Sequence, residues 1–235
     1  MTVLLIFACL IVLLLLTAVF CGLTDLHIHR KPKPGVIRVA CAGDSITNGA
    51  LIPGCFWNSY PSVLGKRLGK NYHVENFGLN GRTLSDQADR PYSAEAEARR
   101  CFDFQPDIVV LMLGTNDTKP KNWRGADDLS KRFDEMLAHF LDLSQQPRII
   151  LCTPPWAKNA ENKLQGITND TEAGLLPDVA ACARKAAEKY GLELIDLYPL
   201  FEGKRELLSY DLIHPNIRGA RLIAAEAAKK IRSAR

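Results

Sequence analysis

Three residues have the types and the settings that nucleophilic catalysis requires. Ser45 lies in the segment Gly43-Asp-Ser-Ile-Thr directly after an apolar run, and His214 follows Asp211 by three positions. A serine hydroxyl is a weak nucleophile until an adjacent base takes its proton. A carboxylate beside the imidazole holds its tautomer and stabilises the imidazolium that then forms. The pattern predicts Ser45 as the nucleophile, His214 as the base and Asp211 as the orienting acid.

Each of these residues also has an ordinary structural interpretation. Ser45 or the preceding aspartate can cap a helix, because short polar side chains accept hydrogen bonds from the first backbone N–H groups of a helix. Asp211 can cap the turn before the last helix in the same way. His214 is set apart from the other histidines of the chain, because Pro215 holds it out of helical geometry and Asp211 lies within one short turn.

Attack on a carbonyl carbon creates an oxyanion, which needs hydrogen-bond donors nearby. One such donor lowers the barrier by about 3–4 kcal/mol. The predicted donors are the backbone N–H of Ser45, the backbone N–H of Gly78 and the side-chain amide of Asn116. Gly78 suits this role because a backbone without a side chain can approach a ligand closely. The alternatives are a glycine that only ends a strand and an asparagine that only shapes the turn after Gly114.

Short apolar, β-branched runs alternate with stretches of helical spacing along the body of the chain. The runs are residues 36–42, 74–77, 108–113, 148–153 and 192–197, and the helical stretches are residues 57–68, 94–102, 128–143, 176–190 and 217–231. Strands that alternate with helices imply a parallel sheet covered on both faces. Residues 154–171 are polar and weakly periodic, which predicts a long loop. The sequence therefore predicts an α/β fold.

The residues with catalytic potential lie at corresponding ends of these runs. Ser45 follows the first run, Gly78 the second and Asn116 the third, whereas Asp211 and His214 precede the last helix. In open parallel sheets, ligands bind outside the carboxyl ends of the strands. We therefore expect these segments to converge at one edge of the sheet.

Four segments together resemble the SGNH (GDSL-type) hydrolase superfamily. They are Gly43-Asp-Ser-Ile-Thr, Asn76-Phe-Gly-Leu-Asn-Gly, Gly114-Thr-Asn-Asp and Asp211-Leu-Ile-His-Pro, and the resemblance covers residues 36–235. It implies a three-layer α/β/α sandwich of flavodoxin-like type with a five-stranded parallel sheet. It also implies a serine esterase with Ser45, Asp211 and His214 as the catalytic residues and Gly78 and Asn116 in the oxyanion hole. The mechanism needs no metal and no organic cofactor.

The substrate is expected to be a small ester, since four segments resemble esterases that remove acetyl groups from carbohydrates. They are Tyr60-Pro-Ser, Asn80-Gly-Arg-Thr, Asp89-Arg-Pro-Tyr and Thr118-Lys-Pro-Lys-Asn-Trp. Arg82, Trp123 and Trp156 are predicted to line a polar, aromatic-walled site suited to a glycan ester. The alternative is that both tryptophans are packing residues and Arg82 belongs to an ion pair. A lysophospholipase or thioesterase acting on longer acyl chains stays open, as does a non-catalytic, membrane-tethered binding protein. Water and another acyl acceptor are not distinguished.

The amino terminus is apolar. Residues 3–23 carry no charge, and a run of about 20 apolar residues can span a bilayer as a helix. This predicts a single-pass transmembrane anchor at residues 1–24, a basic linker at residues 25–35 and the hydrolase domain at residues 36–235. The alternative is a signal sequence, cleaved from a secreted protein, although the basic n-region of such a sequence is missing. The side of the membrane and the oligomeric state are left open.

Composition excludes some other classes of protein. The net charge of +4 is small, and no basic stripe with interleaved aromatics occurs, so nucleic acid is not expected as a partner. The seven cysteines show no CxxC spacing, which favours neither a disulfide framework nor a zinc site.

Overall fold

Five parallel strands form a sheet in the computed structural model, which describes residues 2–158 and 170–233. The strands are β1 Ile37–Gly43, β2 Tyr72–Gly78, β3 Ile108–Met112, β4 Arg148–Cys152 and β5 Glu193–Ile195. They lie in the order β2-β1-β3-β4-β5, and every neighbouring pair is parallel. This is the strand order of flavodoxin-like folds. The predicted five-stranded parallel sheet is confirmed.

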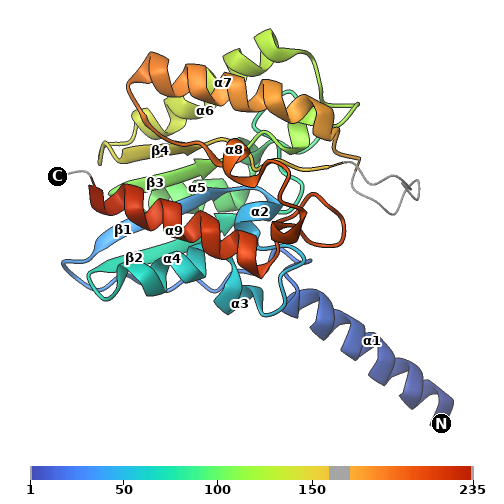
Figure 1. The fold of residues 1–235 in the computed structure, drawn as a ribbon. Helices are drawn as coiled ribbons and strands as arrows, with labels where there is room; N and C mark the ends of the chain where they lie inside the picture. Colours follow the sequence, from blue (N-terminus) through green and yellow to red (C-terminus); the bar gives the residue numbers. More distant parts are fainter. Residues whose placement is uncertain (1, 159–169, 234–235) are drawn as a thin grey trace.

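Helices cover both faces of the sheet (Figure 1). One face carries α4 Tyr60–Leu68, α8 Leu197–Phe201 and α9 Ile217–Ser233. The other face carries α5 Ala96–Asp103, α6 Ala126–Leu141 and α7 Leu176–Tyr190. Successive strand side chains point to opposite faces, so Val39 and Cys41 pack in one core while Ala40 and Ala42 pack in the other. The predicted three-layer α/β/α sandwich is confirmed.

The three neighbouring strands β2, β1 and β3 end at nearly the same level. Gly43, the last residue of β1, pairs with Gly78 at the end of β2 and with Met112 at the end of β3. The chain then turns at once into α2 (Ser45–Asn48), followed by α3 (Cys55–Asn58). The segments that follow these three strands therefore start from one edge of the sheet.

Several elements differ from those expected. The short helices α2, α3 and α8 were not predicted, because helices of four or five residues are too short to display a 3.6-residue period. The longer helices were anticipated, with first or last residues that differ from the predicted ones by up to three positions. Much of the loop predicted at residues 154–171 falls on residues 159–169, which lie outside the described residues.

The amino-terminal helix α1 (Thr2–Phe20) extends away from the sheet and its flanking helices (Figure 1). Over the side chains that the structure describes, no helix combines the length and the apolar character that crossing a membrane requires. The prediction of a membrane location through a single-pass anchor at residues 1–24 is therefore wrong and is corrected here.

Candidate active site

Ser45 is the first residue of α2, directly beyond the end of β1. Asp44 caps this helix, because its Oδ1 accepts a hydrogen bond of 2.9 Å from the N–H of Ile46. Ser45 is buried but keeps 8% of its surface accessible to solvent, whereas Asp44 is fully buried. Burial raises the pKa of Asp44 to about 6, against the opposing effect of the Ile46 N–H. The cap thus holds the short helix that presents the Ser45 hydroxyl at the sheet edge.

His214 contacts both of the other predicted catalytic residues. Its Nε2 lies 2.8 Å from Oγ of Ser45, and its Nδ1 lies 2.5 Å from Oδ2 of Asp211. A carboxylate can only accept a hydrogen bond, so Nδ1 carries the proton and Nε2 is free to accept from the serine hydroxyl. The structure therefore brings Ser45, His214 and Asp211 into one hydrogen-bonded chain.

The turn after Asp211 positions the imidazole. Oδ1 of Asp211 accepts the backbone N–H groups of Ile213 and His214, at 3.1 and 3.0 Å. Burial by itself would raise the pKa of Asp211, but the side-chain hydrogen bond and the charge of His214 outweigh it and lower that pKa. Asp211 is therefore held as a carboxylate, the form that orients the imidazole and stabilises a positive charge on it.

Gly78 lies next to α2, but its N–H is occupied. This N–H donates to Oδ1 of Asn76 at 2.9 Å, which leaves it poorly placed to serve an oxyanion. A Cβ at this position would lie 2.3 Å from the backbone nitrogen of Asn48 and 2.6 Å from the carbonyl carbon of Thr47. Gly78 is therefore required for the close packing of β2 against α2.

Asn116 is buried at the start of the 3-10 turn that follows β3, Asn116–Thr118. Its side-chain Nδ2 donates to the carbonyl oxygen of Arg82 at 3.0 Å, so Asn116 lies against the loop that follows β2. The next residue, Asp117, accepts the N–H groups of Leu84 and Ser85, each at 2.8 Å. Asn116 and Asp117 therefore join the loops that leave β2 and β3.

Gly81 is a candidate site residue that the sequence motifs did not single out. It immediately precedes Arg82, has a φ of +76°, and donates no backbone hydrogen bond to any part of the chain that the structure describes. Its N–H is thus available to a ligand, unlike that of Gly78. The available sequence signal was a second glycine three positions after a strand-ending glycine, in Gly78-Leu-Asn-Gly.

The three predicted substrate-lining residues are all engaged with the protein itself. The guanidinium of Arg82 contacts Glu95 at 2.9 Å and Asp25 at 3.1 Å. Trp123 and Trp156 are partly buried and pack against the cores on opposite faces of the sheet. These contacts match the alternative interpretation, in which the tryptophans pack and Arg82 forms ion pairs.

Comparison with known proteins agrees with the fold. A model of the GDSL-like Lipase/Acylhydrolase family matches residues 41–222. An acetylxylan esterase from Xylanibacter ruminicola is 34% identical over 219 residues, which are 86% of this chain and 44% of that protein. The chain thus spans less than half the length of this relative.

Solved structures share the same architecture. The aryl esterase of M. smegmatis superposes with a TM-score of 0.66 at 22% identity, covering 84% of this chain and 99% of that one. A carbohydrate acetylesterase family member from Sinorhizobium meliloti has a TM-score of 0.64 at 22% identity, covering 84% and 98%. At this level of identity the likeness shows the fold. The chain belongs to the GDSL-like lipase/acylhydrolase family, and its residues 41–222 form a carboxylic ester hydrolase domain.

Proposed function

We propose that the protein removes short acyl groups, chiefly acetyl, from a carbohydrate ester through an acyl-enzyme on Ser45. The observation that carries this proposal is the 2.8 Å contact between Ser45 Oγ and His214 Nε2, with Asp211 on the far side of the imidazole. The acetyl preference is supported by the relative named acetylxylan esterase.

The contacts support a two-step acyl transfer. His214 takes the proton of Ser45 as Oγ attacks the ester carbonyl, and Asp211 stabilises the resulting imidazolium. The tetrahedral intermediate collapses, the ester C–O bond breaks, and His214 returns the proton to the departing alcohol. Water then attacks the acyl-enzyme with His214 again as base, which releases the carboxylic acid and restores the serine.

The oxyanion that forms in each step needs donors, and we assign this role to the N–H of Ser45, the N–H of Gly81 and Nδ2 of Asn116. Gly81 replaces Gly78 in this assignment because the Gly78 N–H already donates to Asn76. Asn116 lies beside the Gly81 segment through its 3.0 Å contact with the carbonyl of Arg82. Such donors act strongly because they are fixed before charge develops.

A substrate series tests the proposal. The purified chain is assayed with nitrophenyl esters from acetyl to decanoyl, and with acetylated xylo-oligosaccharides, while released acetate is measured. We expect kcat/KM to be highest for acetyl and to fall by about 10-fold or more by octanoyl, since a short-acyl site rejects added methylenes. A maximum at long chains would instead favour the lysophospholipase or thioesterase alternative. Absence of turnover and of fluorophosphonate labelling would favour a non-catalytic protein.

A further inference from the structure

We propose that residues 22–30, called the strap here, are part of the active site and that Asp25 is a positioning residue for the oxyanion hole. The strap precedes the region that matches the family, which begins at residue 41. The strap contacts the loop that follows β2, residues 79–83, which carries Gly81 and is called the β2 loop here. This inference rests on the proposed role of the Gly81 N–H as an oxyanion donor.

Asp25 binds the residues on both sides of Gly81. Its Oδ1 accepts the backbone N–H of Asn80 at 2.7 Å, and its Oδ2 accepts Nη1 of Arg82 at 3.1 Å. The same Nη1 also reaches the carbonyl oxygen of Asn80 at 2.6 Å, which closes the turn around Gly81. One carboxylate of the strap therefore restrains the direction in which the Gly81 N–H points.

The strap also contacts the helix that carries Ser45. Nδ2 of Asn48, the last residue of α2, lies 2.9 Å from the carbonyl oxygen of Gly22, 3.2 Å from that of Thr24 and 3.0 Å from Oδ1 of Asn80. The side chain of Asn80 donates to the same Gly22 carbonyl at 3.1 Å. Asn48 and Asn80 thus join α2, the β2 loop and the strap in one network.

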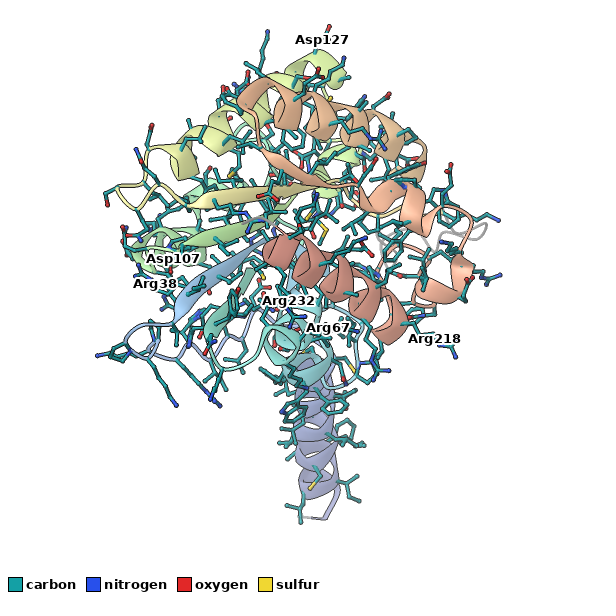
Figure 2. All side chains as sticks on the ribbon, turned by 60° about the vertical axis from the view of Figure 1, so that its left-hand side comes forward. Arg38, Arg67, Asp107, Asp127, Arg218 and Arg232 are labelled. Carbon is teal, nitrogen blue, oxygen red and sulfur yellow. The ribbon has the colours of Figure 1, made fainter. Side chains whose placement is uncertain are left out.

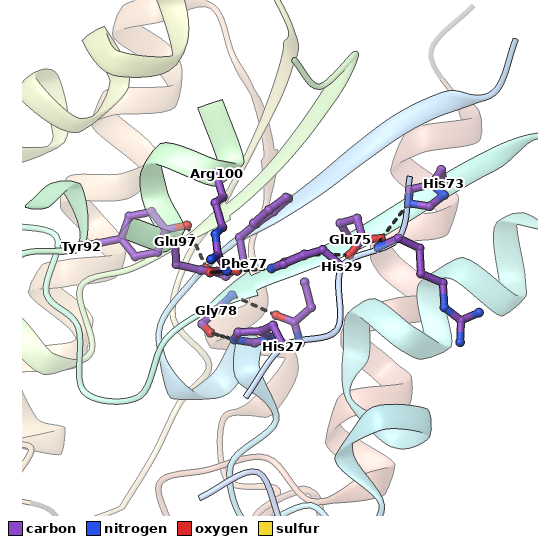
Figure 3. Close-up of polar contacts among 11 residues, drawn as sticks. His27, His29, His73, Glu75, Phe77, Gly78, Tyr92, Glu97 and Arg100 are labelled. Atoms are coloured by element: carbon purple, nitrogen blue, oxygen red, sulfur yellow. Dashed lines mark hydrogen bonds and ion pairs between the residues drawn. The ribbon is translucent and has the colours of Figure 1, made fainter. Parts of the chain in front are cut away.

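Two histidines hold the strap along β2 (Figure 3). Nε2 of His27 lies 2.7 Å from the carbonyl oxygen of Gly78, at the point where β2 passes into its loop. His29 lies between two carboxylates, with Nδ1 3.0 Å from Glu75 and Nε2 2.5 Å from Glu97. Its ring also stacks on Phe77, with centroids 5.1 Å apart. The strap is therefore held along β2 directly after Asp25, the residue that contacts the active-site loop.

The β2 loop is consequently held from two sides. Asn116 contacts the carbonyl of Arg82 from the β3 side, and Asp25 contacts the N–H of Asn80 and the Arg82 guanidinium from the strap side. An oxyanion donor acts only when it points to where charge develops, so loosening one side reduces transition-state stabilisation more than substrate binding. Loss of Asp25 is therefore expected to lower kcat and to leave KM nearly unchanged.

A matched control is available at the opposite edge of the sheet. Asp107 precedes β3, accepts the backbone N–H of Arg38 at 2.7 Å and lies 3.6 Å from its guanidinium. The side chains of Asp107 and Asp25 are 33% and 30% exposed, so the two carboxylates are similarly accessible to solvent. Arg38 and Asp107 lie together at the periphery of the molecule (Figure 2). Asp107→Ala thus removes comparable contacts away from the active site, together with the 2.8 Å hydrogen bond that Oδ1 of Asp107 accepts from Nε2 of Gln145.

The test compares Asp25→Ala, Asp25→Asn and Asp107→Ala in the full chain, with nitrophenyl acetate kinetics, melting temperature and the affinity of a phenylboronic acid. The boronic acid forms a tetrahedral adduct with the serine and so reports on oxyanion stabilisation. We expect Asp25→Ala to lower kcat by about 10- to 100-fold and boronate affinity in parallel, with KM within about 3-fold, because part of one donor's contribution is lost. Asp25→Asn keeps an oxygen acceptor for the Asn80 N–H and is expected to lose less. Asp107→Ala is expected to keep kcat within about 2-fold, since it lies away from the reacting atoms.

The proposal is overturned if Asp25→Ala retains wild-type kcat, if only KM rises, or if Asp25→Ala and Asp107→Ala lose kcat equally. If Asp25→Ala does not fold, Asp25→Asn decides the matter by the same criteria, because it preserves shape. Turnover of nitrophenyl acetate by Ser45→Ala would overturn the proposed function instead. That result is separate, since it does not depend on residues 22–30.

Discussion

Oγ of Ser45 lies 2.8 Å from Nε2 of His214 although 169 positions separate the two residues in the sequence. The contact forms because α2 starts at the end of β1, while the turn after Asp211 brings the imidazole to the same edge of the sheet. Neither residue is reactive by itself at neutral pH. Their contact turns an ordinary serine into a candidate nucleophile.

Replacement of Ser45 by alanine is expected to lower kcat/KM for nitrophenyl acetate by at least about 10⁴-fold, because the acyl-enzyme can no longer form. The melting temperature is expected to change little, since the substitution removes a single side-chain hydrogen bond, that with Nε2 of His214. Ser130→Ala is the control, because Ser130 Oγ bonds the Ala126 carbonyl within α6 and Sγ of Cys182 in α7, and none of these residues has a proposed catalytic role. Activity of Ser45→Ala within 10-fold of wild type would rule out the proposed nucleophile.

Asn116→Ala is expected to lower kcat by about 10²- to 10³-fold, the effect of removing one oxyanion donor. The KM is expected to stay within a few fold, since the donor acts mainly in the transition state. Asn58→Ala is the control, because the Asn58 amide bonds the Pro53 carbonyl in an exposed position. If Asn116→Ala changed KM alone, Asn116 would be a substrate-binding residue and not an oxyanion donor.

Gly78→Ala and Gly81→Ala are expected to behave differently in urea unfolding. An alanine at Gly78 meets backbone atoms at 2.3 and 2.6 Å, so a loss of at least about 3 kcal/mol is expected. At Gly81 the nearest atom is the end of the Arg90 side chain at 3.2 Å, and the φ of +76° costs about 1–2 kcal/mol. Gly81→Ala keeps its N–H and is expected to remain active. Equal stability of the two variants would contradict the packing role given to Gly78.

The cluster of His29 with Glu75 and Glu97 is expected to make the free energy of unfolding depend on pH. Hydrogen bonds with Glu75 and Glu97 raise the pKa of His29 to about 9 from an ordinary 6.5. The folded state binds this proton more tightly, so the stabilisation is complete below about pH 6.5 and is lost as the pH rises through about 9. The pKa values of Glu75 and Glu97 are lowered by His29 against the effect of burial, so their contribution is lost as the pH falls through about 4.5 and below.

Urea unfolding of wild type and His29→Gln tests this window. The free energy of unfolding of wild type is expected to exceed that of His29→Gln by on the order of 1–3 kcal/mol at pH 5.5–6.5, and this difference is expected to shrink by pH 10. Solvent screening of the partly exposed imidazole keeps the difference small. A double-mutant cycle with Glu97→Gln isolates the coupling between the two side chains. A difference that stays constant from pH 5.5 to 10 would show that His29 acts by packing alone.

Much of the fold follows from local patterns. Strand runs at residues 108–113 and 148–153 are apolar on both faces, so they had to be buried between helix layers, and the structure places β3 and β4 there. The turns after β1, β2 and β3 had to meet at one edge because parallel strands share their direction. These regularities also placed Ser45, Asn116, Asp211 and His214 in one region. The apolar character of residues 3–23 was equally clear, but it led to a membrane location that is corrected above.

The sequence by itself determined the sheet, the two helix layers and which side chains with catalytic potential reach its carboxyl edge, because hydrophobic period and turn chemistry are local properties. Only the tertiary structure decided that the Gly78 N–H is occupied by Asn76 while that of Gly81 is available. Only it showed that Asp25 and His29, from a segment read as a linker, bind the β2 loop and β2. The physical reason is that a hydrogen bond is short and directional, so its partner depends on where distant segments finally lie and not on the neighbouring residues.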